Sequence, residues 1–154
     1  MTNEQEAMLI VLCGRLFLGT AQDAEALALL RSPLDWPHLC QRAAEVGMSG
    51  IVASQLQRLE RMHNLDLPLE PFSQTLHGVF RHSGTLLAFL SALSGTLRQK
   101  GLQVILLKGG ALIKTVYREQ PGLRPLGDLD LLVRAEDLPG GEEVLRLHGF
   151  RPLV

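Results

Sequence analysis

Two acidic residues near the end of the chain are spaced so that they could act together. Asp128 and Asp130 begin the run DLDLLV, residues 128–133. Alternate side chains of a strand point to the same face, so these carboxylates would lie side by side and repel each other unless a cation lies against them. Mg²⁺ and Mn²⁺ take oxygen ligands and are often held by one or two carboxylates together with substrate phosphates. The pair predicts a metal site, and the alternative is an edge strand whose acidic face is hydrated.

A second group of residues suits an anion. Lys108, Gly109 and Gly110 follow the apolar run of residues 102–107 and precede a predicted helix over residues 111–119. Glycines let the backbone approach a ligand closely, and the free amides of a helix N-terminus bind anions. Lys108 would add a positive charge. The alternative is a tight strand-to-helix turn, and neither the dinucleotide-binding glycine pattern nor the Walker pattern is met.

Arg124 supplies a third element from the loop of residues 120–127. A guanidinium binds phosphate through two parallel hydrogen bonds and offsets charge in a transition state. The alternative role is an ion pair that orients Asp128 or Asp130. A phosphate-binding turn, a carboxylate pair and a guanidinium are together what metal-assisted phosphoryl or nucleotidyl transfer requires.

The elements ahead of these residues are predicted to be helical. Thr20 is predicted to cap a helix over residues 21–31. Asp35 is predicted to cap the next helix, which has Pro37 in its first turn and ends at Gly47. Asn3 and Glu6 have the spacing of a capping box. The full prediction is helices over 2–18, 21–31, 36–46 and 49–62, a linker over 63–71 and a long amphipathic helix over 71–100 that ends at Gly101.

After residue 101 the hydrophobic period changes from that of a helix to that of short strands. We predict strands over 102–107 and 128–133, helices over 111–119 and 140–149, and the start of a third strand over 150–154. The fold class is therefore α+β, with an N-terminal helical bundle followed by an incomplete α/β unit that has a small mixed sheet. Because the third strand is cut short, we expect the chain to come from a longer protein.

Composition excludes several classes of protein. The formal net charge of -1 over 154 residues gives no basic field, so nucleic-acid binding is not indicated. Cys13 and Cys40 lack metal-ligand spacing and are predicted to be buried thiols in a reducing compartment. The polar N-terminus is unlike a targeting segment, and the apolar runs are too short for a membrane span. We expect a cytoplasmic protein with no membrane partner.

The run LLKGGALIKTVYREQPGLRPLGDLDLLVRAEDL, residues 106–138, resembles the nucleotidyltransferase superfamily related to DNA polymerase β. It is most similar to a bacterial branch of nucleotidyltransferase family proteins. These proteins have a Leu-Lys-Gly-x-Ala-Leu segment, an Arg-Pro-x-x-Asp-x-Asp-Leu-Leu-Val strand and a helical region ahead of both. The resemblance covers residues 101–154 by motif and residues 1–100 by helical layout and the Pro-Leu-Asp-Trp segment at 33–36.

The resemblance implies a helical region over 1–100, a truncated nucleotidyltransferase-like core over 101–154 and a role for each matching residue. Gly109 and Gly110 would hold a nucleoside triphosphate, and Asp128 and Asp130 would bind two Mg²⁺ or Mn²⁺ ions. Lys108 and Arg124, which match the narrower branch, would contact phosphate. The implied reaction moves a nucleoside monophosphate to an acceptor hydroxyl on a small molecule, a protein or RNA.

The chain departs from the superfamily pattern in two ways. Seventeen residues separate Gly110 from Asp128, which is a long interval, and the third carboxylate of the superfamily has no match. The remaining acids of this region, Asp137, Glu142 and Glu143, are predicted to be solvated. These departures leave open a non-catalytic nucleotide-binding or regulatory module. The five histidines are predicted to be surface or helix-end residues, and Trp36 and Tyr117 to be packing residues.

Overall fold

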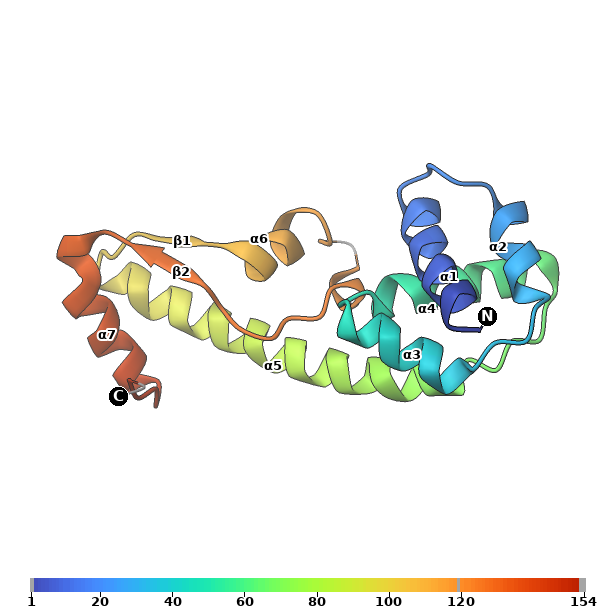
Figure 1. Cartoon of the computed structure of the whole chain (residues 1–154). Coiled ribbons are helices and arrows are strands. Elements are labelled where there is room, and N and C mark those ends of the chain that lie inside the picture. Colours follow the sequence, from blue (N-terminus) through green and yellow to red (C-terminus); the bar gives the residue numbers. More distant parts are fainter. Residues whose placement is uncertain (1, 119, 153–154) are drawn as a thin grey trace. The chain divides into compact units, whose positions relative to one another are not determined.

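The computed structural model describes residues 2–118 and 120–152, and it confirms an α+β fold with a helical N-terminal region (Figure 1). The elements are α1 (Thr2–Phe17), α2 (Asp23–Leu30), α3 (Trp36–Glu45), α4 (Ser49–His63), α5 (Glu70–Gln99), β1 (Val104–Leu106), α6 (Lys108–Thr115), the 3₁₀ turn η1 (Pro121–Leu123), β2 (Leu131–Val133), the 3₁₀ turn η2 (Ala135–Asp137) and α7 (Leu138–Leu147). The described residues form two compact units, 2–80 with 120–125 and 81–118 with 126–152. The domain division at residue 100 stays a prediction.

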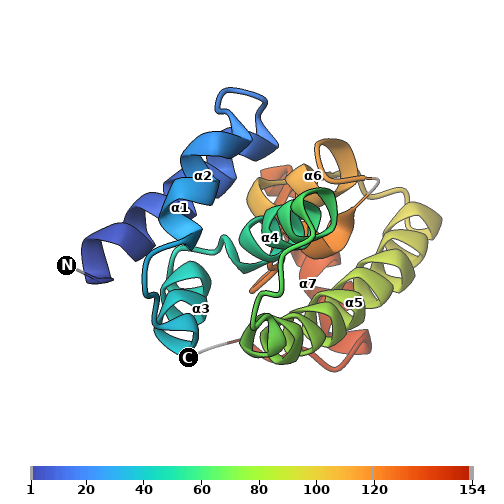
Figure 2. The same cartoon turned by 90° about the vertical axis from the view of Figure 1, so that its right-hand side faces the viewer.

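In the first unit α1 packs against α2, α3 and α4 (Figure 2). The helices bury apolar faces that recur at three- and four-residue steps, as expected for amphipathic helices. The buried core includes Leu9, Cys13, Leu39, Cys40, Leu56, Leu59 and Phe72. Both cysteines are buried free thiols, as predicted.

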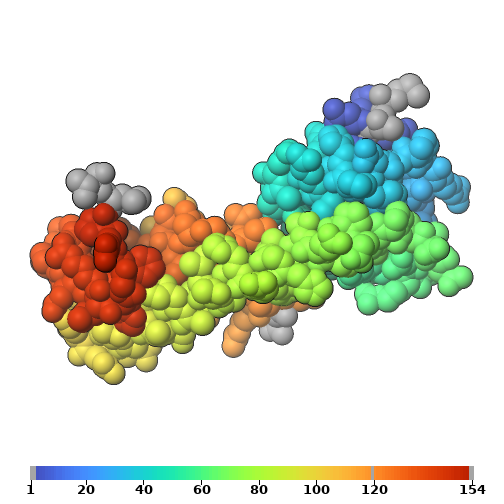
Figure 3. All heavy atoms as spheres, turned by 90° about the horizontal axis from the view of Figure 1, so that it is seen from below, coloured from blue at the N-terminus to red at the C-terminus, as the bar shows by residue number. Residues whose placement is uncertain are grey.

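Helix α3 begins and ends as the sequence predicts. The Asp35 side chain accepts a hydrogen bond from the His38 backbone amide at 3.0 Å, and Pro37 lies in the first turn. Gly47 follows the helix with a φ of 69°, which a residue without a Cβ adopts at little cost. The start of α3 also touches α5, because the Cys40 thiol donates to the Pro71 carbonyl oxygen at 3.3 Å. Figure 3 shows α3 (cyan) beside the first turns of α5 (green).

The predicted start of the second helix was wrong. Helix α2 begins at Asp23 with Gln22 as its N-cap, and the Gln22 amide donates to the Glu25 carboxylate at 3.4 Å. Thr20 instead donates its hydroxyl hydrogen to the Arg15 carbonyl oxygen at 3.2 Å. Thr20 therefore acts at the C-terminus of α1, where it binds a free carbonyl oxygen. Gln22 is the N-cap of α2, whose first turn is acidic.

The capping box predicted for Asn3 and Glu6 was also wrong. Helix α1 already includes Asn3, and the Glu6 side chain is fully buried. Its carboxylate accepts a hydrogen bond from the Asp35 amide at 3.1 Å and lies 2.5 Å from Nδ1 of His38. Buried carboxylates need such partners, so Glu6 ties α1 to the first turn of α3 instead of capping its own helix.

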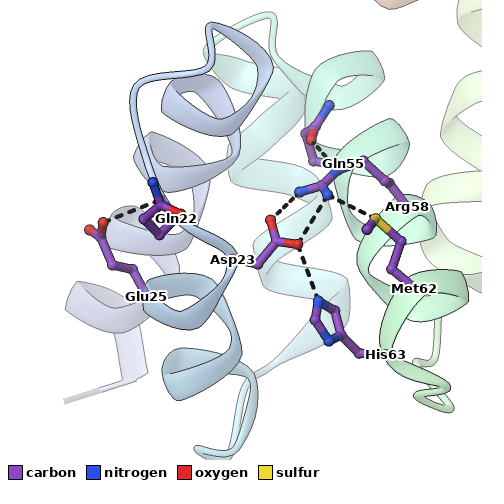
Figure 4. Close-up of polar contacts among 7 residues, drawn as sticks. All are labelled: Gln22, Asp23, Glu25, Gln55, Arg58, Met62 and His63. Atoms are coloured by element: carbon purple, nitrogen blue, oxygen red, sulfur yellow. Dashed lines mark hydrogen bonds and ion pairs between the residues drawn. The ribbon is translucent and has the colours of Figure 1, made fainter.

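A polar cluster joins α2 to α4 (Figure 4). Arg58 donates two hydrogen bonds to the Asp23 carboxylate, at 2.5 Å and 3.1 Å, and a third to the Gln55 side-chain oxygen at 3.0 Å. His63 Nε2 lies 3.1 Å from the second oxygen of Asp23. Asp23 is the first residue of α2, where a negative charge also favours the helix dipole.

The second unit consists of the later part of α5, the two strands, α6 and α7. Strands β1 and β2 are antiparallel, with Val104 opposite Val133 and Leu106 opposite Leu131. Leu93 and Leu97 of α5 and Val144 of α7 form the buried core beneath them. No helix among the described residues is both long enough and apolar enough to cross a bilayer.

The sheet differs from the predicted one. It was expected to be mixed, with a third strand beginning at residue 150, but the two strands of the described chain are antiparallel and residues 150–152 form no strand. Residues 153 and 154 of the predicted strand lie outside the described residues. Each observed strand has only three residues, because β1 ends where α6 begins and β2 starts after the two aspartates.

Candidate functional site

Lys108, Gly109 and Gly110 form the first turn of α6. The helix was predicted to begin at residue 111, but it begins at Lys108, directly after the N-cap residue Leu107. Lys108 has a φ of 47°, an uncommon conformation for a residue with a side chain, and this turns the chain from β1 into the helix within one residue. The amides of the first helical turn have no intrahelical acceptor and point out of the helix end, so they can bind an anion.

The space around positions 109 and 110 also restricts which residues fit there. Gly110 is buried, and a Cβ added to it would lie 2.7 Å from Cδ1 of Leu106. A Cβ on Gly109 would lie 3.3 Å from Cδ1 of Leu126, which is a close but tolerable contact. The close approach of α6 to β1 is therefore sufficient to explain why position 110 is a glycine. At position 109 a Cβ would be tolerated, so anion binding by the backbone remains a further reason for a glycine there.

The two aspartates lie just before β2 and not within it. The strand was predicted to begin at residue 128 and begins at Leu131. Asp130 still continues the pairing with the first strand, because its carbonyl oxygen accepts a hydrogen bond from the Leu107 amide at 2.9 Å. Asp128 is exposed, and the side chain of Asp130 is 29% exposed. The aspartates are therefore beside the start of α6 and open to solvent.

Lys108 supplies the positive charge that the carboxylate pair requires. Its Nζ donates to Oδ1 of Asp130 at 3.1 Å. This hydrogen bond, with the negative charges of Asp130 and Asp128, raises the pKa of the Lys108 ammonium above its usual value. The structure thus gathers Lys108, Gly109, Gly110, Asp128 and Asp130 in the second unit.

Arg124 belongs to the first unit. Its Nη1 lies 3.7 Å from the position that a Cβ on Gly47 would take. Its Nε is buried and has no hydrogen-bond partner in the described parts of the chain. The guanidinium therefore packs against the end of α3 and keeps an unused hydrogen-bond donor.

The donor set suits a hard divalent cation, since the Asp130 carboxylate holds the Lys108 ammonium group and the negative charge of Asp128 also acts on that group. In residues 2–118 and 120–152 no three histidine, cysteine or acidic side chains come together as a metal site. Glu142 and Glu143 are exposed and pair with Arg146 and Lys100, at 3.4 Å and 2.7 Å. Neither acid extends the aspartate pair.

Comparison with known proteins identifies the family of the chain. A family profile described as an uncharacterised nucleotidyltransferase matches residues 32–153, which include every candidate site residue. The chain belongs to this nucleotidyltransferase family. No curated protein and no solved structure matched the chain.

Proposed function

We propose that this protein is a metal-dependent nucleotidyltransferase that transfers a nucleoside monophosphate from a nucleoside triphosphate to an acceptor hydroxyl. The observation that carries the proposal is the hydrogen bond from Lys108 Nζ to Asp130, next to Asp128 and at the first turn of α6. It supports the proposal because groups suited to an anion lie directly beside groups suited to a cation. Magnesium triphosphate, which carries both charges, matches this combination.

Each candidate residue has a separate task in the proposed reaction. Asp128 and Asp130 would hold Mg²⁺ or Mn²⁺, which when bound polarises a phosphoryl group and lowers the pKa of an acceptor hydroxyl. The backbone amides of Gly109 and Gly110 would donate hydrogen bonds to phosphate oxygens. Lys108 keeps its proton at neutral pH, because its pKa is raised, and would neutralise phosphate charge. The proposal of a phosphate contact for Arg124, which belongs to the first unit, rests on the sequence motif and on its free donor.

A second candidate function is nucleotide binding without transfer, as in a regulatory or protein-interaction module. The observation that favours it is that the carboxylate pair gains no third acidic partner within the described residues. Nucleotide binding needs only the amides, the cations and the carboxylate pair, whereas activation of an acceptor hydroxyl calls for a further base. The acceptor, a small molecule, a protein or RNA, belongs to the first candidate only. For both we propose a reducing cytoplasmic setting, supported by the free thiols Cys13 and Cys40.

Calorimetry with the full chain tests the binding step. Mg²⁺ or Mn²⁺ should strengthen nucleoside triphosphate binding, and a chelator should remove this metal-dependent affinity. Asp128→Asn with Asp130→Asn should abolish the metal-dependent affinity while the unfolding transition stays unchanged, because both side chains are at the surface. The matched control is Glu142→Gln with Glu143→Gln, which removes two exposed acids of the same unit. A triphosphate affinity that is the same with and without the metal, and unchanged in the aspartate variant, would refute the proposal.

Release of pyrophosphate then separates the two candidates. A transferase should release pyrophosphate from the bound triphosphate in the presence of its acceptor, and the aspartate variant should not. Tight magnesium-dependent binding without pyrophosphate release across small-molecule, protein and RNA acceptor pools would favour the binding module.

A further inference from the structure

A pocket of about 370 Å³ lies within the first unit, between α4, the first turns of α5 and η1. Its volume is at the lower end of the range for small-molecule sites, so it suits a single ring system better than a large ligand. The side chains that decide its chemistry are Ser54, Gln57, Gln120, Leu76, Phe80 and Pro121.

Two glycines shape the walls of this pocket. A Cβ on Gly50 would lie 2.5 Å from the Cα of Leu123, so the backbone of η1 rests directly on α4. A Cβ on Gly122 would overlap the ring of Phe80, so the ring lies against the backbone of the same turn. Backbone of η1 therefore forms part of the pocket wall, against α4 on one side and against the Phe80 ring on the other.

Among residues 2–118 and 120–152, those that line the pocket carry no charge and combine polar side chains with an aromatic ring. The Ser54 hydroxyl and the amides of Gln57 and Gln120 offer both donors and acceptors, and these side chains have no hydrogen-bond partner in the described parts of the chain. Phe80 is 55% exposed and offers its ring to a ligand. This lining favours a flat, uncharged molecule with hydrogen-bonding edges, and it disfavours a phosphate or a carboxylate.

We infer that the pocket binds a nucleobase, with adenine preferred. The choice of a nucleobase among flat, neutral ligands rests on the proposed function. A glutamine amide can pair with the N6 and N7 edge of adenine through two hydrogen bonds, and an aromatic ring stacks on any base.

Titration of the full chain with adenosine in a chelator tests the inference, because adenosine carries no phosphate and needs no metal. Adenosine should bind, and ribose 5-phosphate, which lacks a base, should not. Gln57→Ala should weaken adenosine binding about tenfold, the effect of losing one paired amide. Gln57 is exposed, so this variant should fold normally. Gln99→Ala, which removes an exposed glutamine at the end of α5, is the matched control and should leave adenosine affinity unchanged.

The inference is overturned if adenosine does not bind at millimolar concentration, or if both Gln57→Ala and Phe80→Leu bind it as well as the unchanged chain does. Asp128→Asn with Asp130→Asn should retain adenosine binding. If the unchanged chain binds adenosine but shows no magnesium-dependent triphosphate binding, the proposed function alone is rejected.

Discussion

The ion pair of Asp23 and Arg58 should stabilise the helical region in a way that depends on pH. The hydrogen bond from Arg58, with a further contribution from His63, lowers the pKa of the Asp23 carboxyl from 3.8 to about 2. The lowered pKa corresponds to about 2 kcal/mol, since a pKa change of one is worth about 1.4 kcal/mol. Because the side chain is 25% exposed, solvent screening reduces the expected contribution to about 1–2 kcal/mol.

The direction of the pH effect follows from the lowered pKa. The folded chain binds the Asp23 proton more weakly than the unfolded chain does, so the stabilisation is complete above about pH 4 and is lost as the pH falls through about 2. Asp23→Asn should therefore lower the free energy of unfolding by about 1–2 kcal/mol at pH 7 and by much less at pH 2. Urea unfolding followed by far-ultraviolet circular dichroism at both pH values measures the difference.

Asp66→Asn is the control for this experiment, because Asp66 lies in the linker between α4 and α5 and takes part in no ion pair of the described chain. It should leave the free energy of unfolding nearly unchanged at both pH values. Two results would refute the reasoning about Asp23: no loss of stability at pH 7, or an equal loss at pH 7 and pH 2.

The remaining predictions concern packing. Gly50→Ala should lower the free energy of unfolding by about 1–3 kcal/mol, because the new Cβ would meet the Leu123 backbone at 2.5 Å. Gly78→Ala, which adds a Cβ into open space within α5, should raise that free energy by about 0.4–1 kcal/mol. Urea unfolding measures both, and a change opposite in sign to the expected one contradicts the prediction for that glycine. Burial raises the pKa of the Cys13 thiol to about 12, so in a Cys40→Ser chain a thiol-specific chromogenic reagent at pH 8 should modify Cys13 only after unfolding. Immediate reaction of the folded chain would show that Cys13 is accessible.

The helices could be predicted where their limits depend on neighbouring residues. The cap at Asp35, the end at Gly47 and the long helix of residues 71–100 agree with the structure to within one or two residues. Glu6 could not be assigned in this way, because its partners Asp35 and His38 are about thirty positions away. The Glu6 carboxylate could hydrogen-bond either within its own helix, as in a capping box, or with a segment distant in sequence. The contacts with the start of α3 prevail, because they provide hydrogen bonds to a carboxylate that is buried.

The composition of the candidate site could be predicted, but its local backbone could not. Spacing and motif selected the lysine, the glycines and the aspartates that the structure places together. The position of Gly109 and Gly110 inside α6 depends on the positive φ of Lys108, which periodicity does not reveal. The shortness of the strands also escaped prediction, because apolar runs continue beyond the residues that pair.

The Lys108–Asp130 pair explains how this site can remain folded before any ligand binds. Two neighbouring carboxylates require a cation, and the ammonium group of Lys108 meets that requirement from the adjacent turn. A triphosphate would compete with Asp130 for Lys108, and a divalent cation would compete with Lys108 for Asp130. Binding of either partner alone leaves one charge of the pair uncompensated, whereas binding of both satisfies the lysine and the carboxylate together. The geometry therefore favours joint binding of metal and triphosphate, which is why calorimetry with and without the metal is the most direct test of this site.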